Sequence, residues 1–206
     1  MPADFTYTAA AAAMLTMPVP GSVLAGPEVT FVWGSVPGAS GYSLWLGSTG
    51  VGSNNLYDSG EWPATSFKVG SLPMNGETIY ARLYTRLDGV TAFVDSTFTA
   101  AQPGILTTPT PGSVLTGASV TFSWTPSTGT PTGYSLWVGS TGVGSNNLFD
   151  SRLEPVNSRI VNGLPTGGET IYVRLYTNFH GVVIWSDSTY TAAGTATADQ
   201  RQIHTP

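Results

Sequence analysis

The chain has 206 residues, of which 41% are hydrophobic and only 9% are charged, and its formal net charge at pH 7 is −5. Soluble domains carry roughly 25% charged residues, so Thr, Ser, Asn and Gly must supply most of the polar surface here. The acidic balance, with Lys68 as the only lysine, argues against nucleic-acid binding, which needs clustered basic side chains. No apolar run approaches the ~20 residues that span a bilayer. The absence of cysteine excludes disulfides, thiolate metal sites and a catalytic thiol.

The first predicted element is a short strand near the N-terminus, and its sequence returns twice farther along the chain. Residues 4–10 (DFTYTAA) resemble residues 95–101 (DSTFTAA) and residues 187–193 (DSTYTAA), which are predicted to be the closing strands of two domains. The chain therefore begins with a surplus closing strand, followed by a spacer that ends at residue 13. One interpretation is that the sequence is a segment of a longer array.

The alternative interpretation is that the surplus strand docks on a neighbouring molecule. An unpaired strand exposes N–H and C=O groups that the edge of another sheet can bind. The predicted partner is then the chain itself, in a head-to-tail homopolymer or between neighbouring repeats of a longer chain. The predicted strand-addition segment comprises Asp4, Phe5, Thr6, Tyr7 and Thr8.

The rest of the chain is dominated by one domain-sized sequence that occurs twice. Residues 41–59, GYSLWLGSTGVGSNNLYDS, return at residues 133–151 with only two exchanges, Leu46 to Val138 and Tyr57 to Phe149. Both exchanges keep the position hydrophobic. The offset is 91 residues early in the repeat and 92 after one inserted residue, which indicates a repeated domain rather than a solenoid turn of roughly 20 to 50 residues.

Four segments follow from this repetition. The surplus strand and its spacer occupy residues 1–13, the first repeat residues 14–101, the second repeat residues 105–193, and a polar tail residues 194–206. Gln102, Pro103 and Gly104 join the two repeats.

Each repeat is predicted to be a β-sandwich. Short stretches of alternating apolar and polar residues are separated by Pro, Gly and Asn turns every ~8 to 12 residues, which is typical of sandwiches. Alternation predicts that one face of each strand is buried. The predicted core residues are Phe31, Trp33, Tyr42, Leu44, Phe122, Trp124, Tyr134 and Leu136.

Particular residues connect both repeats with a known family. In each repeat a Trp ends one strand, a Tyr opens the next, and a Leu-Pro pair precedes a Thr-Ile-Tyr strand. These markers are Trp33, Tyr42, Leu72-Pro73 and Thr78-Ile79-Tyr80, and Trp124, Tyr134, Leu164-Pro165 and Thr170-Ile171-Tyr172. The pattern resembles fibronectin type III repeats, with immunoglobulin-like repeats as relatives that share it. The Leu-to-Tyr spacing is longer here, and alternation turns Ile79, Ala81 and Leu83 inward rather than Tyr80.

The resemblance also carries an expectation about function. Tandem copies of this kind are similar to those of large bacterial surface proteins, where they serve as spacers, adhesion modules or filament subunits. It therefore implies an extracellular or cell-surface structural protein. No nucleophile–base pair is evident in the sequence, so the chain is not expected to be an enzyme. No motif in the chain indicates a cofactor.

Few residues could carry chemistry. His180 lies in a predicted turn and His204 in the tail, with no spacing typical of a metal site or a catalytic triad. The glycine-rich segment at residues 47–53 lacks the lysine and the following helix of a phosphate loop, so turn formation is the better interpretation. Asn54, Asn55 and Asp58 could touch a weakly held ion, although Asp58 is better explained as a turn residue.

The better candidates for a functional surface are the outward side chains of the central strands. They are Trp45, Tyr80, Arg82 and Tyr84 in the first repeat and Trp137, Tyr172, Arg174, Tyr176 and Trp185 in the second, with Phe93 as the counterpart of Trp185. Three interpretations stand: a cation–π stack that stiffens the sheet, a contact with a neighbouring chain, or a surface for sugar rings. The expected function is a structural repeat of an extracellular array or filament, with carbohydrate binding or adhesion as the alternative.

Overall fold

The computed structural model describes residues 11–194. The predicted strand-addition segment at residues 4–8, His204 and the tail from residue 195 onward lie outside the described residues. Backbone contacts divide the chain into two compact units between Gln102 and Pro103, except that residues 128–131 group with the first unit. Neither unit contains a helix among the described residues, so none there is long and apolar enough to cross a membrane.

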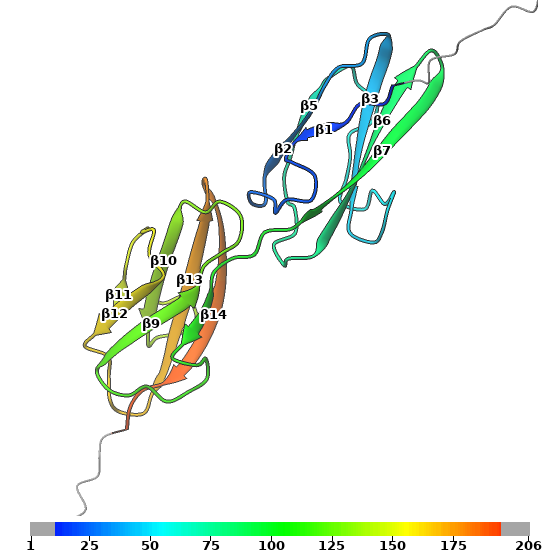
Figure 1. Ribbon diagram of the computed structural model, residues 1–206. Coiled ribbons are helices and arrows are strands. Elements are labelled where there is room, and N and C mark those ends of the chain that lie inside the picture. Colours follow the sequence, from blue (N-terminus) through cyan, green and yellow to red (C-terminus); the bar gives the residue numbers. More distant parts are fainter. Residues whose placement is uncertain (1–10, 195–206) are drawn as a thin grey trace, which may run out of the picture. The chain divides into compact units, whose positions relative to one another are not determined.

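The first repeat forms two antiparallel sheets (Figure 1). One sheet has three strands in the order β1-β2-β5, and the other has four in the order β4-β3-β6-β7. The strands are β1 (Leu15–Met17), β2 (Val29–Trp33), β3 (Ala39–Gly47), β4 (Tyr57–Asp58), β5 (Ser66–Val69), β6 (Thr78–Leu87) and β7 (Val90–Thr99).

The second repeat has the same two sheets, in the orders β8-β9-β12 and β11-β10-β13-β14. Its strands are β8 (Ile105–Thr108), β9 (Ser119–Thr125), β10 (Gly133–Gly139), β11 (Phe149–Asp150), β12 (Ser158–Asn162), β13 (Thr170–Phe179) and β14 (Val182–Thr191). The expected all-β fold of two tandem sandwiches is therefore confirmed.

The core of each repeat lies between its two sheets because the strands alternate in burial. In β2, Val29, Phe31 and Trp33 are buried while Thr30 is exposed, as a period of two requires. All eight residues expected in the two cores are buried, and Phe31 packs edge-to-face on Phe98 with ring centroids 5.5 Å apart.

Three hydroxyl groups at the ends of the cores accept hydrogen bonds from backbone N–H groups. The hydroxyl of Tyr42 accepts a hydrogen bond from the backbone N–H of Val36 at 2.7 Å, and Tyr134 accepts one from Ser127 at the same distance. Thr85 is fully buried, and its hydroxyl accepts the backbone N–H of Ala13 at 2.8 Å. Ala13, which the sequence assigns to the spacer, thus packs in the core of the first repeat.

Candidate functional site

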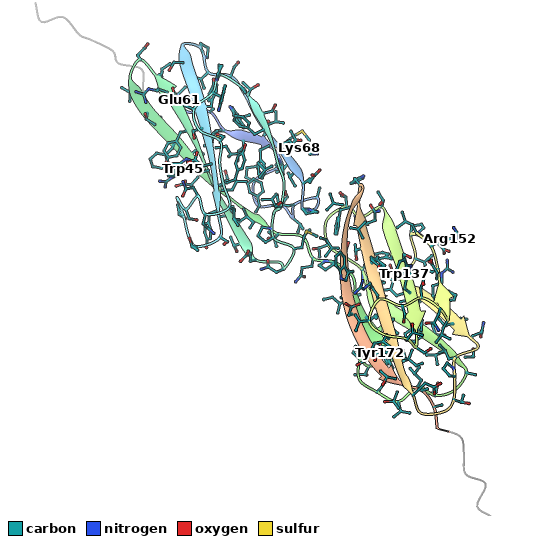
Figure 2. The ribbon with its side chains drawn as sticks, turned by 180° about the vertical axis from the view of Figure 1, so that it is seen from behind. Trp45, Glu61, Lys68, Trp137, Arg152 and Tyr172 are labelled. Carbon is teal, nitrogen blue, oxygen red and sulfur yellow. The ribbon has the colours of Figure 1, made fainter. Side chains whose placement is uncertain are left out.

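The outward face of the four-stranded sheet carries aromatic and charged side chains in two adjacent rows. In the first repeat, Trp45 of β3 pairs with Arg82 of β6, and Arg82 pairs with Asp95 of β7. The next row pairs Tyr84 of β6 with Phe93 of β7. Side chains on one face of paired strands lie close enough to interact, so the five form one cluster, which we call the outer stack; Figure 2 shows Trp45 with the surrounding side chains.

The aromatic rings of the outer stack touch in sequence. Trp45 meets Tyr84 edge-to-face at 4.9 Å between ring centroids, and Tyr84 meets Phe93 at 5.8 Å. These distances lie in the range of favourable aromatic pairs, which contribute about 0.5 to 1.5 kcal/mol beyond burial of area.

Arg82 is bound on two sides within this stack. Its Nε donates to Asp95 Oδ1 at 2.7 Å and its Nη2 donates to Asp95 Oδ2 at 2.8 Å, a bidentate pair. Its guanidinium carbon also lies 4.0 Å from the centroid of the Phe93 ring. The hydrogen bonds from Arg82 lower the pKa of Asp95 below its ordinary value, and the same bonds raise the pKa of Arg82 above its ordinary value.

The second repeat builds the same stack with one change. Arg174 Nε and Nη2 donate to Asp187 at 2.7 and 2.8 Å, and Trp137 meets Tyr176 at 4.8 Å. Trp185 takes the place of Phe93, and the Arg174 guanidinium carbon lies 5.3 Å from its ring centroid. In both repeats the arginine is therefore hydrogen-bonded to an aspartate and lies over an aromatic ring. Of the three interpretations of this face, the cation–π stack agrees best with this arrangement.

The near-identical stretch at residues 41–59 has a role in holding this arginine. Gly52, in the loop between β3 and β4, has a φ of +81°, and a Cβ built on it would lie 2.9 Å from Arg82 Nη1. Gly144 has the same relation to Arg174, at 3.0 Å. Only glycine combines this backbone conformation with so close an approach.

The loop's polar residues bond to one another. Asn55 Oδ1 accepts the backbone N–H of Ser48 at 3.1 Å, and Asp58 Oδ1 accepts that of Gly60 at 2.9 Å. Asn54 donates to the other oxygen of Asp58 at 3.2 Å. These are turn-stabilising contacts, and residues 11–194 contain no group of three or more His, Asp or Glu side chains that could hold a metal ion.

Two predicted outward residues remain apart from the stack. Tyr80 and Tyr172 are half-buried on the same strands, but neither ring pairs with another aromatic ring of the described chain. His180 is exposed in the turn between β13 and β14 with a φ of +52°. Asp95 and Asp187, in contrast, were not expected in the set, although the strand register brings each to its arginine.

Comparison with known proteins finds similarity to solved structures only. No family model matches the chain, and no curated protein matches its sequence. Fibronectin(III)-like modules of Clostridium thermocellum CbhA align over 94% of this chain and 100% of theirs, at 11% identity and a TM-score of 0.34. A two-domain fibronectin type III segment of chicken tenascin aligns over 86% of this chain and 97% of its own, at 16% identity and a TM-score of 0.37.

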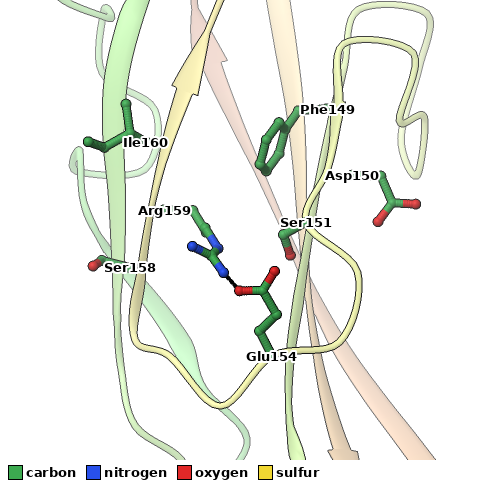
Figure 3. Close-up of a pocket in the computed structure, with 7 residues that line it drawn as sticks. All are labelled: Phe149, Asp150, Ser151, Glu154, Ser158, Arg159 and Ile160. Atoms are coloured by element: carbon green, nitrogen blue, oxygen red, sulfur yellow. Dashed lines mark ion pairs between the residues drawn. The ribbon is translucent and has the colours of Figure 1, made fainter.

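By its own sheet order, each repeat is a fibronectin type III-like sandwich. Beside the short strand β11, the second fibronectin type III-like repeat has an open pocket of about 610 Å³. Figure 3 shows Arg159 and Glu154 pointing toward one another in it as an ion pair.

The last feature of the face is its free edge. β7 is the edge strand of its sheet, and its far end is paired in parallel with the segment before β2: Thr97 and Thr99 exchange backbone hydrogen bonds with Gly21, Ser22 and Leu24. Within the described residues, no backbone hydrogen bond covers the outer edge of residues 90–96. β14 repeats this arrangement: Thr189 and Thr191 are covered, whereas residues 182–188 are not.

Proposed function

We propose that the chain is a structural repeat segment of a bacterial extracellular array or filament, which assembles by strand addition at the free edges of β7 and β14. The occupant is residues 4–8 of a neighbouring copy or of a neighbouring repeat. On this proposal the chain is non-catalytic, and it lies outside the cell or on its surface. The outward aromatic side chains beside these edges form the rest of the contact.

The free edge is the observation that carries this proposal. Thr97 and Thr99 direct their backbone groups away from β6, and alternation of the antiparallel ladder gives Thr91, Phe93 and Asp95 the same direction. The edge therefore presents three consecutive outward residues with N–H and C=O groups available to an added strand. In β14 the corresponding residues are Val183, Trp185 and Asp187.

The side chains along the edge support the same proposal. Val90 is 59% exposed and Phe93 is 49% exposed, and Trp185 of the second repeat is 53% exposed. Proteins usually protect free edges with lysine, proline or a bulge, because long apolar edges attract other strands. These edges contain neither lysine nor proline.

Proline at an outward position tests this proposal directly. In the variant T91P/V183P, the two edges lose an outward N–H while the ladders to β6 and β13 keep every hydrogen bond. We expect the wild-type chain to form polymers visible by negative-stain electron microscopy and in sedimentation velocity. The proline variant and a chain lacking residues 1–10 should both sediment as monomers.

The matched control is T91V/V183T, which changes the same side chains and keeps both N–H groups. It should polymerise as the wild type does. Polymers of unchanged length from the proline variant or from the shortened chain would refute strand addition, and a wild-type chain that stays monomeric at all concentrations would refute assembly itself.

A second candidate function, recognition of sugars, is favoured by a different observation. Each repeat has a groove beside its outer stack, in equivalent positions. The stack's arginine is engaged by its aspartate, so sugar contacts by Arg82 or Arg174 are not part of this candidate.

A further inference from the structure

The two repeats contain the same groove with different rims. A groove of about 380 Å³ lies over β3 and β6 in the first repeat, and one of about 360 Å³ lies over β10 and β13 in the second. Both volumes fall within the range of small-ligand sites, roughly 300 to 1,000 Å³. The shared lining is Ser43, Trp45, Asp58 and Tyr84 in the first groove and Ser135, Trp137, Asp150 and Tyr176 in the second.

One wall of each groove is aromatic and held in place. Trp45 contacts Tyr84 edge-to-face, and Trp137 contacts Tyr176 in the same way. All four side chains are half-buried, so part of each ring faces solvent. A wall of this kind offers a rigid apolar surface to the C–H face of a ring-shaped ligand at a low cost in conformational entropy.

The strand beside each tryptophan supplies hydrogen-bond acceptors at a fixed place, because Asp58 pairs with Trp45 and Asp150 with Trp137. Asp58 accepts one hydrogen bond on each oxygen, from Gly60 and from Asn54. An ionised carboxylate has about four acceptor positions, so it keeps capacity for a ligand hydroxyl. Asp150 is held in the same way by the backbone of Arg152 and by Asn146.

Each rim carries charges of both signs. Arg86 lines the first groove together with Asp58 and Glu61, and it lies 3.6 Å from the Glu61 carboxylate. Arg152 lines the second groove together with Asp150. An anion would meet the carboxylate and a cation would meet the guanidinium, whereas a neutral polyhydroxylated ring can donate to one and accept from the other.

We propose that each groove binds one neutral sugar residue of a glycan, with its C–H face on Trp45 or Trp137 and its hydroxyls at Asp58 or Asp150. The rims differ because Glu61 and Arg86 of the first repeat are replaced by Leu153 and Asn178 in the second. The two sites therefore take the same class of ligand with different selectivity, and the tandem chain binds a polysaccharide at two points. Two linked sites raise the apparent affinity when one polymer reaches both.

Nuclear magnetic resonance of the chain lacking residues 1–10, which the proposed assembly leaves monomeric and which keeps both grooves, tests this inference through the indole N–H signals. The probes are cellohexaose, mannohexaose and N-acetylchitohexaose as neutral sugars, with tetragalacturonate as an anion and choline as a cation. We expect at least one neutral probe to shift the signals of Trp45 and Trp137 saturably, with a Kd on the order of 1 mM, as befits two shallow sites. W45F and W137F assign the two signals.

D58N/D150N keeps a carbonyl acceptor for the turn and removes the charge, and it should weaken binding at least tenfold. Y80F/Y172F alters the same sheet face outside both grooves and should bind as the wild type does. Shifts from none of the neutral probes, shifts from only choline or tetragalacturonate, or full affinity in D58N/D150N would each overturn the inference. Polymer formation is a separate readout, since D58N/D150N leaves the strand edges intact.

Discussion

Phe67 and Arg159 stand at the same position of the two repeats, and each is paired across its sheet with a core phenylalanine, Phe31 or Phe122. In the first repeat, Phe67 packs on Trp33 at 5.8 Å between ring centroids. In the second, Arg159 forms an ion pair with Glu154 instead and lines the pocket of Figure 3. An aromatic side chain thus packs on the core of the first repeat at the position where the second repeat has an ion pair.

Replacing this ion pair by the apolar residues at the same positions of the first repeat should stabilise the second. In E154W/R159F, Trp and Phe take the positions that Trp62 and Phe67 hold in the first repeat. Replacing a partly buried ion pair by packed apolar side chains is neutral or stabilising, and at about one-third exposure we expect a gain of about 1 kcal/mol. Chemical denaturation of the full chain measures it.

The reverse exchange, W62E/F67R, is the matched control and should destabilise the first repeat by about 2 kcal/mol, because Phe67 loses its contact with Trp33. A second repeat that becomes less stable in E154W/R159F would show that the ion pair, not the aromatic cover, is the better solution there.

The strand faces were predictable from the sequence because a strand has a period of two. Alternation in residues 29–33 and 42–46 assigns Phe31, Trp33 and Leu44 to the core and Trp45 to the outer face, where the structure has them. The near-identity of residues 41–59 and 133–151 then predicts the same inward and outward faces in the second repeat.

The pairing of Arg82 with Asp95 was within reach of the sequence but was not predicted. Asp88 and Gly89 form a two-residue turn, and such a turn fixes the register of the whole hairpin. Residues equally far from the turn on either side must then pair, which places Asp95 opposite Arg82. The approach of Gly52 to the same arginine depends on how a loop folds over the sheet, and no periodicity encodes that.

Replacing Arg82 by lysine should destabilise the first repeat by about 1 kcal/mol, because an ammonium loses both the bidentate geometry and the stacking on Phe93. Its matched control is R86K: Arg86 lies 3.6 Å from Glu61 with both side chains about half exposed, so this exchange should change stability little. Thermal unfolding at neutral pH compares the two. Equal effects would contradict a special role for the outer stack.

Acid should reduce the difference between the wild type and R82K. The pKa of Asp95 is lowered in the folded state, so its contribution is present above the ordinary aspartate pKa of about 3.9 and is lost as the pH falls through the lower folded pKa. Below about pH 4 the two melting curves should therefore approach each other, and the same comparison made in a D95N background should show no such trend. Curves that stay equally separated down to pH 2 would exclude the ionised pair as the source.

Alanine at Gly52 tests whether the loop presses on the arginine. Gly21 is the matched control, since its φ of +84° is nearly the same and a Cβ there would meet nothing within 4 Å. Both G52A and G21A should cost about 1 kcal/mol for the left-handed backbone. G52A should cost more because its Cβ displaces the Arg82 guanidinium, and the excess should vanish in an R82A background. Equal costs in the wild-type background would mean that Arg82 moves aside freely.

Alkaline pH should weaken the second repeat through Tyr190. This side chain is 2% exposed, its hydroxyl donates to the carbonyl of Pro109 at 3.1 Å, and burial raises its pKa to about 12. An exposed tyrosine ionises near pH 10, so between about pH 10 and 12 the unfolded chain loses a proton that the folded chain keeps. The contribution of Tyr190 to the free energy of unfolding is then constant below pH 10 and falls above it, by up to about 3 kcal/mol.

Y190F isolates this contribution, because subtracting its stability from that of the wild type at each pH cancels every other titrating group. At neutral pH the variant should be about 1 kcal/mol less stable, since it lacks the hydrogen bond to Pro109. Above pH 10 the order should reverse, because phenylalanine cannot ionise in the unfolded chain. The first repeat needs no such variant: Phe98 holds the equivalent position, with the same edge-to-face contact to a core phenylalanine. If the stability curves of wild type and Y190F run parallel from pH 7 to 12, the pKa of Tyr190 is the same in the folded and the unfolded chain.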